Sequence, residues 1–168
     1  MILVPLSDVP ALAVESLLDR AFGADRHTRT AYRLRSGTAQ MASLSFAAVD
    51  DHGALAGTIQ CWPVRFVGDD GRDVPMVLVG PVAVEPGLQR GGVGRRLMAH
   101  MLAAADSSKL AGTDALMLIG DPEYYGRFFG FSAEATAAWR LPGPFEPRRL
   151  LARGSGVPDG AGAVGPRA

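Results

Sequence analysis

The chain has 168 residues, of which 48% are apolar and 20% are charged, as in ordinary globular proteins. Its 17 lysines and arginines balance 17 aspartates and glutamates, so no overall charge draws it to nucleic acid or to an acidic membrane surface. The single cysteine, Cys61, excludes an intramolecular disulfide and fits a reducing compartment.

The length favours a single domain, which we expect over residues 1–153. The N-terminus lacks the basic start and long apolar stretch of a signal peptide, and no window approaches ~18 uninterrupted apolar residues. We therefore expect a soluble, cytoplasmic protein with no membrane partner. Residues 154–168 are rich in glycine and proline, which predicts a mobile C-terminal tail.

The N-terminal half predicts an edge strand over residues 2–6, followed by a helix that ends near Gly23 and is capped by Ser7 or Asp8. Residues 24–43 are polar and predict a second helix or a loop. Strands are expected next, over residues 44–49, 54–67 and 74–84, and Pro63 indicates an edge or a bulge within the second of them.

The C-terminal half has its clearest helical pattern over residues 92–108. An apolar strand is expected over 115–119, a short helix from Asp121-Pro122 to Phe128, a final strand region from Phe131, and another short strand over residues 150–152. This order predicts a mixed α/β fold around a central sheet.

The segment with a chemical signature runs from Val82 to Arg96, where a strand enters a glycine-rich turn and a helix opens from that turn. The first N–H groups of a helix have no partner within the helix and carry partial positive charge. Gly91, Gly92 and Gly94 let a ligand approach the main chain. The segment therefore predicts an anion site suited to a pyrophosphate.

Three arginines, Arg90, Arg95 and Arg96, crowd the start of this helix. Each opposes the helix macrodipole at a cost of about 0.3–1 kcal/mol, which a bound phosphate would turn into a gain, although arginines that point into water explain the cluster as well. Other phosphate loops fit worse, because the chain has no Gly-x-x-x-x-Gly-Lys-Ser/Thr run. Leu97 also stands where a dinucleotide fingerprint needs its third small residue.

The run Gln89-Arg90-Gly91-Gly92-Val93-Gly94 resembles the acetyl-CoA signature of the GNAT superfamily of N-acetyltransferases, Gln/Arg-x-x-Gly-x-Gly/Ala. Downstream, the apolar strand, Tyr124-Tyr125 and Gly130-Phe131 resemble a second family feature, and residues 120–128 look most like the bacterial YhbS-type branch. The resemblance covers residues 74–131. It implies an α/β, GNAT-like fold: a mixed, mostly antiparallel central sheet flanked by helices and splayed at the central strand pair.

The resemblance also implies a site for acetyl-CoA as cosubstrate. Main-chain groups of Val82 and Val84 would pair with the pantetheine arm like an added strand. The N–H groups of residues 90–95 would hold the pyrophosphate. The cofactor-binding residues expected on this basis are Val82, Ala83, Val84, Gln89, Arg90, Gly91, Gly92, Val93, Gly94, Arg95 and Arg96.

In the family, a tyrosine of the short helix protonates the departing thiolate. We expect Tyr125 in this role, because Asp121-Pro122 fixes the start of the helix ahead of it. Tyr124 is the alternative, because this chain has one residue more before Gly130 than family members usually have. Both rings also suit a packing role. The base that accepts the amine proton stays open among Asp121, Glu123, Glu85 and water, with Asp121 favoured as the helix cap and Glu85 as an arginine partner.

The function implied is transfer of an acetyl group from acetyl-CoA to a primary amine by direct attack. The acceptor, a small molecule or a peptide, cannot be identified from the sequence, and a homodimer, common in the family, stays open. Two alternatives remain: a non-catalytic acyl-CoA-binding or sensing module, and another nucleotide-binding protein that uses the same turn. No metal is expected, because His27, His52 and His100 lack paired-ligand spacing, and Cys61 is expected as a small buried hydrophobe.

Overall fold

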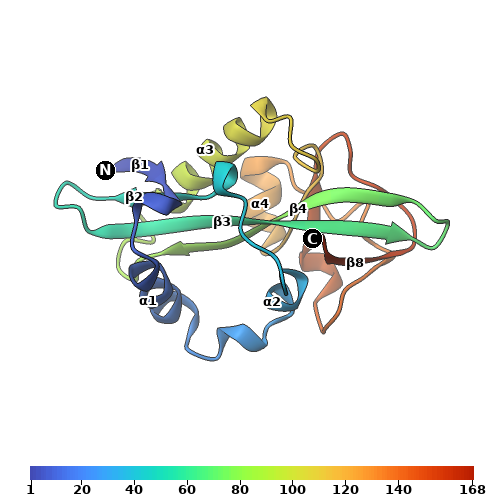
Figure 1. Cartoon of the computed structure of the whole chain (residues 1–168), viewed down its shortest axis with the longest axis horizontal. Helices are drawn as coiled ribbons and strands as arrows, with labels where there is room; N and C mark the ends of the chain where they lie inside the picture. The colour runs from blue at the N-terminus through green and yellow to red at the C-terminus, as the bar shows by residue number, and fades with distance from the viewer. The chain divides into compact units, whose positions relative to one another are not determined.

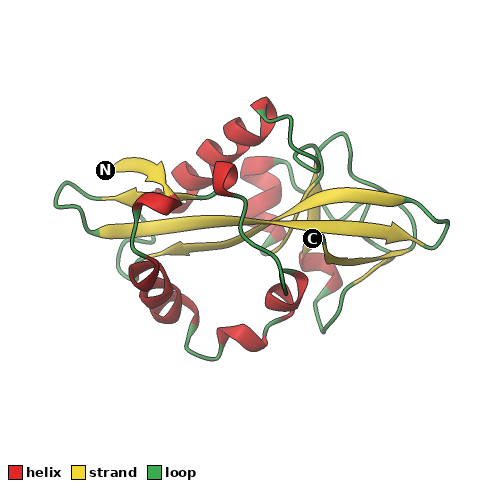
Figure 2. Cartoon of the chain, viewed as in Figure 1, coloured by secondary structure: helices red, strands yellow, loops and turns green.

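A computed structural model describes residues 1–168, and its helices and strands are shown in Figure 2. The helices are α1 (Ala11–Phe22), α2 (Thr30–Leu34), α3 (Val93–Ser107) and α4 (Pro122–Phe129), with short 3-10 turns η1 (Leu6–Asp8), η2 (Arg26–Thr28), η3 (Ala42–Leu44) and η4 (Pro147–Arg149). The strands are β1 (Ile2–Pro5), β2 (Phe46–Val49), β3 (Leu55–Gly68), β4 (Asp73–Val84), β5 (Leu116–Ile119), β6 (Trp139–Arg140), β7 (Leu150–Arg153) and β8 (Gly162–Pro166). None of the helices has the length and apolar character that a membrane-spanning segment needs.

The eight strands form one mixed sheet with the main order β1-β2-β3-β4-β5-β7, and β8 pairs with β3 and β6. The pairs β4–β5 and β6–β8 are parallel, whereas β1–β2, β2–β3, β3–β8 and β5–β7 are antiparallel. The central pair β4–β5 is short, since β4 meets β5 only at Val77 and Leu78. This is the mixed, mostly antiparallel sheet that the sequence predicts.

The chain divides into two compact units. Unit 1 contains Met1–His27, Gln40–Cys61 and Gly80–Ser107, and unit 2 contains Thr28–Ala39, Trp62–Val79 and Ser108–Ala168. The long strands β3 and β4 contribute residues to both units. The expected division into one domain over residues 1–153 and a tail stays a prediction.

In unit 1, α1 covers one face of the strands (Figure 1), where Leu17 and Leu18 are buried with Ala47 and Ala83. The helix begins after Pro10, which makes no side-chain cap. The expectation that Ser7 or Asp8 caps α1 is therefore wrong, because both residues are taken up by the preceding turn η1.

The opposite face of the same strands carries α3 (Figure 1). At Gly57 of β3, a Cβ would lie 2.8 Å from Val93 Cγ1 and 3.1 Å from Leu97 Cδ1. Since real Cβ atoms essentially never approach within 3.0 Å of another heavy atom, glycine allows the first turn of α3 to lie directly on the strand. The position of this helix start is thus fixed by a close contact in unit 1.

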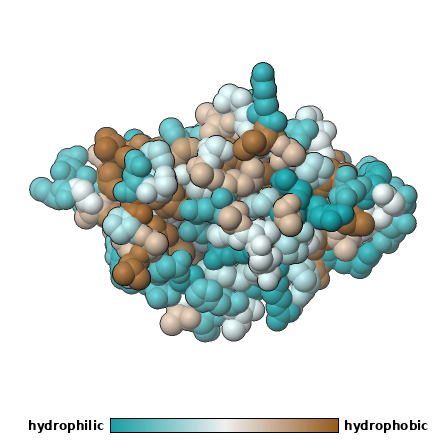
Figure 3. All heavy atoms as spheres, in the orientation of Figure 1, coloured by the Kyte–Doolittle hydropathy of each residue, from teal (hydrophilic) through white to brown (hydrophobic).

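Strand β1 is one of the two ends of the main sheet order and pairs only with β2. Apolar side chains gather on the visible surface around β1 and α1, shown in brown in Figure 3. Ile2 of β1 is 61% exposed and Leu12 of α1 is 82% exposed. Because β1 ends the sheet order, the edge strand expected over residues 2–6 is confirmed, with Ile2–Pro5 as its observed bounds.

In unit 2, a second core joins buried side chains from the remaining elements, including Leu34, Phe66, Met117, Leu150 and Val164. Val164 comes from the segment whose composition predicts mobility. Here that segment contains β8, which pairs with residues 64–68 of β3 and buries one apolar side chain. Alternation along a strand turns Val164 inward, and Val157 of the same segment also packs against this core.

Pro63 of β3 lies between two partner strands. The strand pairs with β2 as far as Ile59 and with β8 from Val64 onward. Because proline has no N–H to donate, it is tolerated where one ladder has ended and the next has not begun.

Candidate functional site

The glycine-rich turn of unit 1 is built from two consecutive main-chain turns after β4. The N–H of Leu88 donates to the carbonyl of Glu85 at 2.9 Å, and the N–H of Gly91 donates to the carbonyl of Leu88 at 3.1 Å. The N–H of Glu85 donates to Ala56 on β3 at 2.8 Å, so the turn is anchored where it leaves the sheet.

The turn leads directly into α3, and the first amides of this helix have no hydrogen-bond partner. Gly92 has φ 78°, a conformation that favours glycine, and its carbonyl accepts the N–H of Arg96 at 3.0 Å. The N–H groups of Gly92, Val93 and Gly94 have no acceptor within the protein. A Cβ at Gly92 would meet no atom within 4 Å, so the main chain there is open to a ligand.

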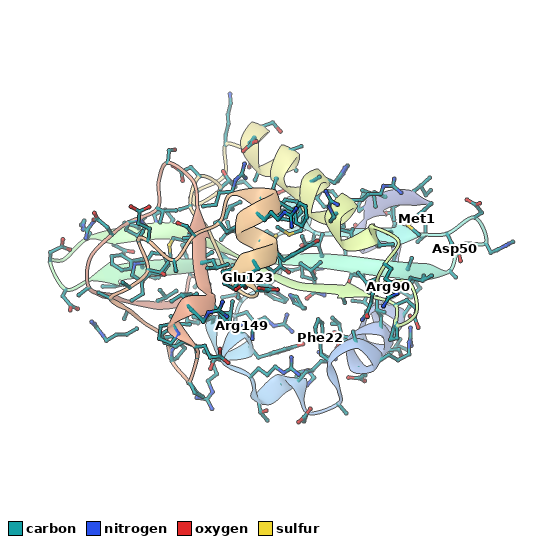
Figure 4. All side chains as sticks on the ribbon, turned by 180° about the vertical axis from the view of Figure 1, so that it is seen from behind. Met1, Phe22, Asp50, Arg90, Glu123 and Arg149 are labelled. Carbon is teal, nitrogen blue, oxygen red and sulfur yellow. The ribbon has the colours of Figure 1, made fainter.

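Exposed positive charge surrounds these amides. Figure 4 shows Arg90 on the loop that leads into α3, and its guanidinium has no partner in the protein. Arg96 contacts only the carbonyl of Met1, at 3.5 Å, and Arg95 is exposed on the same turn. No carboxylate pairs with Arg90 or Arg96, so the helix start combines uncompensated cations with open N–H groups, as an anion site requires.

In unit 1, the last residues of β4 have one edge that pairs with no other strand. The N–H of Glu85 points to β3, and successive residues of a strand direct their main-chain groups to alternate edges. The main-chain groups of Val82 and Val84 therefore face the other edge, where β4 pairs with a strand only at Val77 and Leu78. Ala83, in contrast, buries its side chain against α1.

The carboxylate of Glu85 is held by a residue that the sequence did not single out. Arg20 of α1 donates from Nε to Oε1 at 3.1 Å and from Nη2 to Oε2 at 2.7 Å. The expectation that Glu85 pairs with an arginine is confirmed. No sequence pattern links residues 65 positions apart, so the identity of the partner came only from the fold.

In unit 2, α4 has well-defined ends. Asp121 caps it by accepting the N–H of Glu123 at 3.0 Å, as predicted. Gly130 ends it with φ 72°, while the N–H of Phe131 donates to the carbonyl of Tyr125 at 3.2 Å. This capping fixes where Tyr124 and Tyr125 lie on the helix.

The ring of Tyr125 packs against the end of β5, since a Cβ at Gly120 would lie 2.6 Å from its Cε2. Its edge-on contact with Phe131 has a centroid distance of 6.3 Å. Burial raises the pKa of Tyr125 to about 12, so the phenol keeps its proton at neutral pH. Its hydroxyl makes no hydrogen bond within the protein and is free to donate one.

The carboxylates considered as bases all have structural partners. Asp121 caps α4, and Glu85 is paired with Arg20. A hydrogen bond with Asp121 and the ion pair with Arg148 hold the pKa of Glu123 below its usual value, which makes it a weak base. Figure 4 shows Glu123 on α4 and Arg149 on the neighbouring turn η4.

Two further features bear on the chemistry. No three His, Cys, Asp or Glu side chains come together in an arrangement that could hold a metal ion. Cys61 is fully buried, as predicted, and burial raises the pKa of its thiol, so it is poorly suited to act as a nucleophile.

The open mixed sheet, the short parallel contact at its centre and the glycine-rich helix start together define a GNAT fold. A family model described as the acetyltransferase (GNAT) family matches residues 11–131. The chain belongs to this family.

Solved structures share this fold. A GNAT family N-acetyltransferase (YhbS) from Escherichia coli in complex with CoA has a TM-score of 0.72 and 25% sequence identity, and the match covers 99% of this chain and 89% of that one. A GNAT family acetyltransferase from Brucella melitensis in complex with acetyl-CoA has a TM-score of 0.64 at 24% identity, with 99% and 96% covered. No curated protein matches the chain.

Proposed function

We propose that this protein transfers the acetyl group of acetyl-CoA to a primary amine of a small-molecule or peptide acceptor. The observation that carries the proposal is the run of unpaired amides at Gly92, Val93 and Gly94, beside Arg90 and Arg96, which no carboxylate neutralises. A diphosphate would satisfy both the amides and the cations. The similarity to a GNAT structure that holds CoA supports coenzyme A as the source of that diphosphate.

The strand edge beside this loop fits the rest of the coenzyme. The pantetheine arm carries amide groups along an extended chain, and such a chain pairs with an open strand edge as an added strand does. Val82 and Val84 offer main-chain groups on an edge of β4 that has no strand partner there. The cofactor-binding residues that we propose are therefore those of the β4 end, the glycine-rich turn and the first turn of α3.

The reaction that we propose is a direct attack without a covalent enzyme intermediate. The amine nitrogen forms a bond to the acetyl carbonyl carbon, the carbon–sulfur bond breaks, and coenzyme A leaves as a thiolate. Tyr125 donates its phenolic proton to that thiolate, and water takes the proton from the amine, since the carboxylates considered as bases already have partners. The main contribution of the protein is to position the two reactants.

Calorimetric titration with acetyl-CoA, ATP and NAD tests the binding step. We expect heat with acetyl-CoA only; tight binding of ATP without binding of acetyl-CoA would refute the proposal. Gly92→Ala, which strains a residue at φ 78°, should weaken acetyl-CoA binding about tenfold or more. Gly71→Ala is the matched control, because Gly71 also has positive φ and open space but lies in the β3–β4 turn.

A turnover screen with acetyl-CoA against a library of amines, read as released thiol, tests catalysis and finds the acceptor class. Tyr125→Phe should lower kcat about 100-fold near neutral pH, the usual range for loss of a general acid, with CoA binding unchanged. Tyr124→Phe should have a smaller effect. If the protein binds acetyl-CoA but acetylates no amine, and both variants bind it normally, a non-catalytic acyl-CoA-binding module is the better description.

A further inference from the structure

The Arg20–Glu85 pair joins the last turn of α1 to the residue at which the glycine-rich turn begins. Three side-chain hydrogen bonds connect the two groups, from Nε at 3.1 and 3.3 Å and from Nη2 at 2.7 Å. The main chain of Glu85 is fixed independently by Ala56 and Leu88. The position of the Glu85 backbone therefore does not depend on Arg20, whereas the position of its carboxylate does.

The pair contributes little to stability by ordinary standards. Arg20 is 48% exposed and Glu85 is 28% exposed, and exposed ion pairs add little to the free energy of folding. A different consequence follows from its location. An unpaired carboxylate at the mouth of an anion-binding turn would repel the same phosphates that the open amides of residues 92–94 attract.

We propose that Arg20 is a positioning residue for coenzyme binding, which holds the Glu85 carboxylate on α1 and cancels its charge beside the glycine-rich turn. The inference rests on the proposed function, because it assumes that the turn binds the phosphates of coenzyme A. With Glu85 neutralised in this way, Arg90 and Arg96 act on the ligand without a competing carboxylate.

The test is a double-mutant cycle with Arg20→Gln, Glu85→Gln and the double variant, using the Kd of CoA from calorimetry at low ionic strength. Arg20→Gln frees the carboxylate and should raise the Kd about threefold to tenfold. Glu85→Gln removes the repelling charge and should bind CoA at least as tightly as the wild type. The double variant should return to within about twofold of the wild type, and about 0.5 M salt should shrink the Arg20→Gln penalty.

Arg65→Gln is the matched control, because Arg65 is a similarly exposed arginine that also pairs with a carboxylate. It lies near the end of β3 and pairs with Asp73 at the start of β4. Its loss should leave the Kd of CoA unchanged. Circular dichroism confirms that each variant folds. If Glu85→Gln weakens binding as much as Arg20→Gln and the double variant is no better, the pair acts only by holding α1 to the turn, and the charge argument is overturned. Unchanged CoA binding by Arg20→Gln also overturns the inference, whereas a wild-type protein that binds no CoA contradicts the proposed function as well.

Discussion

At the scale of single residues, the reaction that we propose depends on the protonation state of Tyr125, which its surroundings set. Tyr125 is shielded by the end of β5 and by Phe131, and its pKa is raised to about 12, above the ordinary value of about 10. A phenol in this state is a proton donor across the physiological range. The same shift links the ionisation of Tyr125 to folding.

We expect one of the three tyrosines to titrate near pH 12 in the folded protein, and Tyr125→Phe to abolish that phase of the tyrosinate absorbance. Because the folded pKa is higher than the unfolded one, the stabilising contribution is complete below about pH 10 and is lost as the pH rises through about 12. Urea unfolding at about pH 9 and about pH 11 should show a smaller loss of stability in Tyr125→Phe than in the wild type. Tyr32→Phe is the control, and an unchanged titration in Tyr125→Phe would contradict the assignment.

Cys61 should be inert in the native state, because its side chain is fully buried and burial raises the pKa of its thiol. An aromatic disulfide reagent should therefore label no thiol in the folded protein and one thiol in denaturant. This result matters for the turnover assay, since released coenzyme A would then be the only thiol detected. Rapid labelling of the native protein, absent in Cys61→Ala, would show that Cys61 is accessible after all.

At the scale of elements, the start of α3 is positioned by its contact with β3. Gly57 lies beneath the first turn of this helix, close to Val93, Leu97 and the carbonyl of Ala83. The open amides of residues 92–94 therefore project from a helix end that rests directly on the sheet. A precise anion site needs such a rigid support.

Gly57→Ala should destabilise the protein by about 1–3 kcal/mol, because its Cβ would lie 2.8 Å from Val93 and 2.9 Å from a main-chain oxygen. Denaturant unfolding measures this change, and acetyl-CoA binding should weaken with it as the helix start shifts. Gly165→Ala on β8 is the matched control, because a Cβ there meets nothing within 4 Å. Equal stability of the two variants would mean that α3 does not rest on Gly57.

At the scale of the whole molecule, each unit has its own core, and the C-terminal segment belongs to the core of unit 2. Arg167 secures it by donating to the carbonyls of Val64 at 2.9 Å, Met76 at 3.0 Å and Ala111 at 3.1 Å. Three segments of unit 2 are thus held by one guanidinium at the end of the chain.

Arg167→Ala should lower the free energy of unfolding by about 1–3 kcal/mol, since it leaves three carbonyls without their charged donor. Removal of residues 162–168 should cost more, because it also removes β8 and the buried Val164. Thermal unfolding compares these variants with Lys109→Ala, which deletes an exposed cation that has no partner. If truncation leaves the melting temperature unchanged, the segment is the mobile tail that its composition predicts.

The sequence by itself determined most of the element order, the family and the glycine-rich helix start, because these depend on local periodicity, turn residues and the spacing of one motif. It also located the Asp121 cap, which involves residues two positions apart. The caps expected for α1 were wrong, since Pro10 and the turn η1 took their place.

Only the tertiary structure decided that Arg20 pairs with Glu85, that Gly57 supports α3 and that β8 joins β3. Each of these facts depends on segments far apart in the chain, whose contact follows from how the whole sheet packs. Local sequence carries no record of such a partner, because an arginine, a glycine or a short valine-containing strand looks the same with or without one. For that reason the sequence identified the glycine-rich turn, whereas Arg20 and Gly57 could be connected with it only from the structure.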